Sequence, residues 1–61
     1  MTHSEMLWVA KIAIEKRWDF ERMKYSDYLY GKEEHAEDVW DYVVECDKIG
    51  RDSFEEKYKD E

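Results

Sequence analysis

The sequence contains no proline, two glycines and one cysteine in 61 residues. A single cysteine cannot form an intrachain disulfide, and such isolation is typical of a reducing compartment. The chain does not open with the basic segment and apolar run of a secretory signal. The apolar run Met6–Ala10 ends at Lys11, well short of the roughly 20 residues that a membrane-spanning helix needs. We therefore expect a cytoplasmic protein.

A chain this short has little room for a core. A domain of about 60 residues buries only about 60% of the surface that its unfolded chain exposes. Hydrophobic residues make up 43% of the sequence, charged residues 44% and aromatic residues 16%. This composition is typical of a folded helical protein with large side chains in a small core, so we expect one domain spanning 1–61.

Gly31 and Gly50 divide the chain into three predicted helical segments. The first begins with a capping box of Thr2 and Glu5, and its end is predicted near Lys24 or near Tyr30. Its apolar residues fall on two different sides of the helix, which a single helical hairpin cannot cover, so self-association is predicted. The two apolar sets are Leu7, Ile14, Trp18, Tyr25 and Leu29, and Met6, Val9, Ala13 and Phe20.

The second segment runs from about Lys32 to Ile49 and has its apolar residues at helical spacing, with Gly50 as the stop. The third begins with a capping-box pattern at Ser53 and places Phe54 and Tyr58 four residues apart, on one side of a short helix. The alternating pattern of strands is missing. The predicted fold is all-α: a helical hairpin of two longer helices plus a short C-terminal helix, self-associating as a dimer or higher oligomer.

The net charge of −7 is unevenly placed along the chain. Residues 1–30 carry five acidic and five basic side chains, whereas residues 31–61 carry twelve acidic and five basic ones. Nucleic acids and anionic membranes both attract positive charge, so direct binding of this negatively charged chain to either one is disfavoured. A basic surface on another protein is the partner that this charge favours.

Most of the excess negative charge falls on one face of the second segment. Carboxylates recur there at spacings of four, three and four residues, with one more alongside, and like charges at such spacings repel. One interpretation is a solvated face. The other is a row of charge that imitates a nucleic-acid backbone or docks on a basic patch. The candidate partner-binding carboxylates are Glu34, Glu37, Asp38, Asp41 and Glu45.

Tryptophans are the second class of candidate partner-binding residue, since aromatic side chains often anchor interfaces. Trp18 lies in the main apolar set and is predicted to be core. Trp8 lies outside that set, and Trp40 lies at the edge of the apolar side of its own helix. Trp8 and Trp40 are therefore the two candidate anchors.

Catalytic and metal-binding patterns are missing. His35 is one imidazole among carboxylates, fewer ligands than a zinc site uses, and the carboxylates lack the loop and central glycine of an EF-hand. Cys46 lies on the apolar side of its helix, where an inert buried thiol is expected. No glycine-rich phosphate loop occurs. We expect no enzymatic activity, no cofactor and no metal.

These observations predict a small acidic binding protein that inhibits or modulates a larger protein by docking on its basic surface, such as a nucleic-acid-binding surface. An accessory protein of a phage or mobile element would fit this description. Two alternatives stay open. One is an oligomeric structural or adaptor subunit that uses the apolar first helix, and the other is an oligomer that binds a small polar ligand through tyrosine and basic side chains.

Overall fold

The first helix, α1 (His3–Lys16), begins where its capping box predicts. In the computed structural model, which describes residues 1–59, the Thr2 Oγ1 accepts a hydrogen bond from the Glu5 backbone N–H at 3.2 Å. The same hydroxyl donates to the Glu5 carboxylate at 3.3 Å. The first of these bonds satisfies a backbone donor that the first turn of a helix otherwise leaves unpaired, and the second links the two side chains of the cap.

The end of α1 differs from the prediction. The helix stops at Lys16 because Arg17 adopts the left-handed conformation, with φ 57° and ψ 41°. The Trp18 N–H donates to the Ala13 carbonyl at 3.0 Å and the Arg17 N–H to the Ile14 carbonyl at 3.3 Å. This pair of bonds is the Schellman motif, which usually has glycine in the left-handed position. A continuous helix reaching Lys24 or Tyr30 is therefore wrong.

A short helix, α2 (Phe20–Lys24), follows this break. Asp19 is its N-cap, and the Asp19 carboxylate accepts from the Arg22 N–H at 2.8 Å. The chain then passes through two 3₁₀ turns, η1 (Asp27–Leu29) and η2 (Glu33–His35), which are separated by Gly31 at φ 75°. The buried Ser26 hydroxyl donates to the Met23 carbonyl at 2.7 Å. Residues 20–35 thereby fold back toward α1.

Replacing Arg17 by glycine is expected to stabilise the fold. A left-handed conformation costs a residue with a side chain about 1–2 kcal/mol, and glycine avoids most of that cost. We expect Arg17→Gly to raise the free energy of unfolding by about 1 kcal/mol, and hence the melting temperature by about 4–8 °C. Thermal denaturation followed by circular dichroism measures this change. An unchanged or lower melting temperature would show that the Arg17 side chain stabilises the fold by at least as much as the backbone strain destabilises it.

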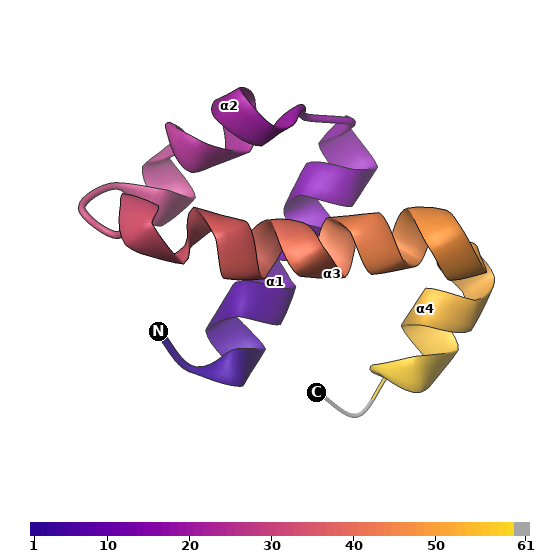
Figure 1. The fold of residues 1–61 in the computed structure, drawn as a ribbon. Coiled ribbons are helices and arrows are strands. Elements are labelled where there is room, and N and C mark those ends of the chain that lie inside the picture. The colour runs from indigo at the N-terminus through magenta and orange to yellow at the C-terminus, as the bar shows by residue number, and fades with distance from the viewer. Residues whose placement is uncertain (60–61) are drawn as a thin grey trace.

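The third helix, α3 (Ala36–Ile49), crosses α1 and carries the second segment of the sequence much as predicted (Figure 1). Gly50, at φ 91°, ends it. The contact between α1 and α3 is the most extensive between any two helices. The short helix α2 lies to one side of this crossing, in contact with α3. The first core cluster lies between these elements; its buried members are Val9, Ala10, Ala13, Met23, Leu29, Ala36 and Val39.

Both apolar sets of the first segment are used largely within one chain. Leu7, of the main set, and Val9 and Ala13, of the second set, are each 1% exposed. Met6 and Phe20 are partly buried against the first core cluster. The two sides that appeared to require a second copy are largely covered, because the break at Arg17 lets the chain turn over its own first helix. Tyr25 of the main set is an exception, at 68% exposed. Self-association stays a prediction, and the second apolar set no longer argues for it.

The last helix, α4 (Arg51–Lys57), begins directly after Gly50 and not at Ser53. Ser53 is an exposed residue inside the helix, so its capping-box pattern is not used. Phe54 is 1% exposed and forms a second core cluster with Leu7 and Cys46. The ring of Tyr58 lies 4.9 Å from that of Phe54. The predicted arrangement of two longer helices and a short C-terminal helix tucked in by these aromatic rings is confirmed. Across residues 1–59, no helix combines the length and apolarity that crossing a membrane requires.

Candidate functional site

Four of the five candidate carboxylates belong to α3, and the fifth, Glu34, lies in the 3₁₀ turn η2 just before it. Glu37 and Asp38 stand in the first turn of α3, where the positive end of the helix dipole stabilises negative charge. All except Glu45 are exposed. We call these five residues, Glu34, Glu37, Asp38, Asp41 and Glu45, the acidic surface.

The centre of the acidic surface is concave. Asp38, Asp41 and Glu45 line a hollow of about 310 Å³, together with Met6 from α1 and Tyr42 from α3. Met6 is partly buried against the core, so it supplies an apolar wall among the carboxylates. A long basic side chain has an apolar stem and a charged head. The hollow therefore has the chemistry to receive a lysine or arginine.

Asp38 and Asp41 are the exposed carboxylates of the hollow. Both are exposed, and neither forms an ion pair with any of the residues 1–59. They differ in this respect from Glu55 and Glu56 of α4, which pair with Arg51 and Lys59, each at 3.2 Å. An exposed charge that pairs with none of the described residues can pair with a charge on another molecule.

Glu45 differs from its neighbours because it also holds α4 against α3. The Tyr58 hydroxyl donates to both oxygens of the Glu45 carboxylate, at 2.8 and 3.0 Å. Lys57 Nζ donates to the same carboxylate at 2.8 Å. These bonds, first that of Lys57 and then that of Tyr58, lower the pKa of Glu45, while burial and the neighbouring carboxylate raise the pKa of Tyr58. Sequence spacing alone had placed Glu45 only with the partner-binding carboxylates.

The lowered pKa of Glu45 makes stability depend on pH. A carboxyl group whose pKa is lower in the folded state stabilises the fold above its unfolded pKa, and that contribution is lost as the pH falls through the folded pKa. We expect the wild-type protein to lose stability below pH 4.5, the ordinary value for this group, and Glu45→Gln to lose less over the same range. Denaturant unfolding at a series of pH values measures how the free energy of unfolding changes with pH in both proteins.

Glu56→Gln is the matched control for this prediction, because among residues 1–59 this carboxylate pairs with the exposed Lys59 alone. Its pH dependence should follow that of the wild type. If Glu45→Gln shows the same slope as Glu56→Gln, the bonds from Lys57 and Tyr58 do not contribute to acid sensitivity.

Two histidines flank the acidic surface. The Tyr42 hydroxyl and His3 Nδ1 share a hydrogen bond, and the two rings meet edge to face with their centroids 5.4 Å apart. His35 Nε2 lies 3.7 Å from a carboxylate oxygen of Glu34. Within the described part of the chain, no three side chains of the types that bind metals are grouped closely enough to hold an ion.

The two candidate tryptophans lie away from the hollow. Trp8 is 56% exposed, and its ring meets that of Tyr28 edge to face with a centroid distance of 5.2 Å. Trp8 and Met6 are two residues apart on α1, so they point about 160° away from each other. Trp40 is half-buried and packs on Phe20, with a centroid distance of 5.7 Å. The structure thus brings Asp38, Asp41 and Glu45 together, but neither tryptophan joins them.

Sequence analysis missed the residues that give the acidic surface its shape: Met6 and Tyr42, which line the hollow, and Lys57 and Tyr58, which hold Glu45. Met6 and α3 are brought together by the crossing of two helices, and no local pattern encodes that crossing. Comparison with models of known protein families, with curated proteins and with solved structures found no match, so any function is argued from this chain's own residues.

Proposed function

We propose that this chain is a small acidic binding protein that inhibits or modulates a larger protein by docking on its basic surface. The observation that carries the proposal is the pair of exposed carboxylates, Asp38 and Asp41, which form no ion pair with residues 1–59 and lie over a hollow that has Met6 in its wall. Unpaired charge supplies attraction, and the hollow supplies a place for one basic side chain to enter.

The charge of the whole molecule supports the same proposal. A net charge of −7 on 61 residues surrounds the protein with a negative potential, which attracts a basic partner over a distance and raises the rate of association. Close charge pairs at an interface then contribute on the order of 1.5 kcal/mol or more each. Both effects weaken with salt, because ions screen exposed charges.

A nucleic-acid-binding surface is the kind of basic surface that we propose. Asp38, Asp41 and Glu45 follow one another along α3 at intervals of three and four residues, which correspond to about 4.5 and 6 Å along a helix axis. A row of negative charges with a regular short spacing resembles a phosphate backbone, so such a partner would bind either the row or its own nucleic acid. An inhibitor that belongs to a phage or mobile element could act by this competition.

The proposal is tested by affinity capture followed by competition. The immobilised protein is exposed to a plausible host lysate, eluted with a salt gradient, and the partner is purified. We expect elution at moderate salt and displacement of the purified partner by duplex DNA or RNA. A partner that stays bound at high salt would contradict docking by charge. A partner that is released by salt but not by nucleic acid would contradict the mimicry and leave the charge-driven docking supported.

A structural or adaptor role is the second candidate, and one observation favours it. Trp8 and Tyr28 are 56% and 40% exposed and pack on each other. Tyr25 and Tyr30, nearby in sequence to Tyr28, are 68% and 83% exposed. Exposed tryptophan and tyrosine often anchor interfaces. In this role the partner would be held by apolar contact, and Trp8→Ala would release it while the charge of the acidic surface would not matter.

A further inference from the structure

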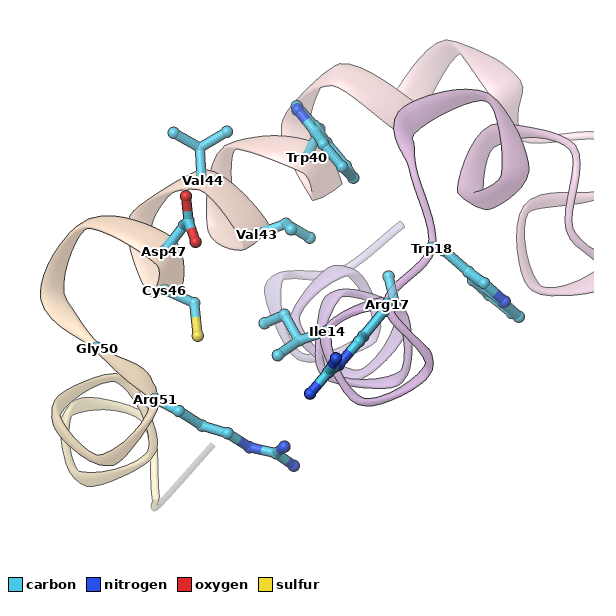
Figure 2. Close-up of a pocket in the computed structure, with 11 residues that line it drawn as sticks. Ile14, Arg17, Trp18, Trp40, Val43, Val44, Cys46, Asp47, Gly50 and Arg51 are labelled. Atoms are coloured by element: carbon cyan, nitrogen blue, oxygen red, sulfur yellow. The ribbon is translucent and has the colours of Figure 1, made fainter.

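A second concave surface lies at the junction of α1, α3 and α4. It is a groove of about 610 Å³, lined by side chains from the end of α1, from one side of α3 and from the start of α4 (Figure 2). Ile14, Trp40, Val43 and Cys46 supply much of its apolar wall. Its volume lies within the range of about 300–1,000 Å³ that is usual for sites that bind small organic molecules.

Two arginines give the groove a charge opposite to that of the whole molecule. Arg17, just after α1, and Arg51, at the start of α4, extend their guanidinium groups toward the same end of the groove (Figure 2). Arg51 pairs with Glu55 through Nε at 3.2 Å, which leaves its terminal nitrogens available. Arg17 forms no ion pair with the described residues. Asp47 is the acidic side chain in the lining.

The backbone at Arg17 points to a role for its side chain. Arg17 is the one residue other than glycine with a positive φ among residues 1–59. Glycine would occupy this position of the Schellman motif with less strain. Strained residues of this kind cluster at binding and catalytic sites. The guanidinium group is thus kept at the groove at a cost to the backbone.

We propose that the groove binds a small organic anion with an apolar body. The guanidinium groups of Arg17 and Arg51 would hold the anionic head, as arginine does for carboxylates and phosphates. The apolar body would lie over Ile14, Val43 and Trp40. This site lies apart from the acidic surface, since the two linings share no residue.

The same features argue against a protein as the occupant. A stable protein interface buries about 800 Å² on each partner, which is far more surface than the lining of the groove supplies. A second copy would also bring a net charge of −7 against the same charge, and such like charges repel. A small anion needs only the groove and its two arginines.

The test compares two probes that share a ten-carbon chain, decanoate and 1-decanol. Each is titrated into the protein below its aggregation limit and followed by backbone amide chemical shifts. We expect saturable binding of decanoate with the largest shifts at Ile14, Trp18 and Val43, and binding of decanol weaker by about tenfold, since two charge-assisted hydrogen bonds are lost. Raising the salt concentration should reduce the difference in affinity between decanoate and decanol, because salt screens the charge of the carboxylate.

Variants then separate the two arginines from the apolar wall. Arg17→Gly, which suits the backbone, and Arg51→Gln should each weaken decanoate binding by about threefold, as expected for one charged contact near solvent. Both variants should leave decanol binding unchanged. Lys48→Gln is the control, because it removes one positive charge from α3 outside the groove. It should bind both probes as the wild type does.

Three results would overturn the proposal. One is the absence of saturable binding at these residues, and another is equal affinity for decanoate and decanol, which would reveal an apolar patch without anion recognition. The third is a dimer in sedimentation equilibrium whose dissociation shifts the same amide signals, because a second copy would then occupy the groove. Partner capture by the acidic surface does not enter any of these measurements.

Discussion

Reversing two charges of the acidic surface, by Asp38→Lys together with Asp41→Lys, is expected to lower the affinity for the protein partner by about a hundredfold or more. Each interfacial charge pair contributes on the order of 1.5 kcal/mol or more, and each reversal also introduces repulsion. Both carboxylates are exposed and unpaired within the described chain, so no internal bond is broken by the change. Titration calorimetry with the purified partner measures the loss.

The stability of this double variant should change little. Lysine at these two positions removes repulsion between carboxylates along α3, while loss of Asp38 from the first turn weakens a favourable interaction with the helix dipole. A melting temperature close to that of the wild type would show that weaker binding comes from the surface and not from unfolding.

The matched control is Glu15→Lys together with Glu21→Lys. These exposed residues lie on α1 and α2, and their reversal changes the net charge by the same amount. We expect it to weaken binding far less, because only long-range attraction is reduced. Equal losses in the two double variants would mean that net charge alone drives binding. If neither variant loses affinity, the acidic surface is a solvated face and the aromatic residues around Trp8 become the leading candidate.

Truncating Phe54 to alanine is expected to unfold much of the protein or release α4. Phe54 is the largest of the fully buried side chains and is 1% exposed. Removing a buried phenylalanine typically costs about 3–5 kcal/mol. A chain of this length has a total stability of roughly 3–9 kcal/mol. This one substitution can therefore remove most of the free energy of unfolding. Circular dichroism should show a large loss of helix or a much lower melting temperature.

Two further variants show whether the loss comes from the core contact. Phe54→Leu keeps an apolar side chain in the second core cluster and should lose less stability than alanine. Ile49→Ala shortens an apolar side chain that is 42% exposed near the same end of α3, and it should change stability only slightly. A Phe54→Ala protein as stable as the Ile49→Ala protein would mean that α4 contributes little to the fold.

Local signals predicted the parts of the fold whose causes are local. Thr2 caps α1 as expected, and Gly50 ends α3, because a cap and a left-handed stop depend on neighbouring residues alone. Asp19 carried a similar signal for the start of α2, which was overlooked within a long apolar pattern. The break at Arg17 had no such signal, since arginine rarely takes a positive φ.

The candidate site was predictable to a smaller extent. Spacing along one helix correctly grouped Asp38, Asp41 and Glu45 on one side of α3. It could not show that Met6 would lie among them, or that Tyr58 and Lys57 would bind Glu45, because these contacts depend on how separate helices pack. The groove between Arg17 and Arg51 could not be predicted for the same reason, because it forms only where α1, α3 and α4 meet.

The two core clusters have a consequence for the order in which the protein can assemble. Every buried residue of the first cluster lies between Val9 and Val39, whereas the second requires Phe54. The first cluster contains no residue of α4, so it can form before α4 docks. The second cluster, which joins α4 to Leu7 near the opposite end of the described chain, forms only when α4 docks. The acidic surface acquires its bonds from Lys57 and Tyr58 to Glu45 only at that last stage.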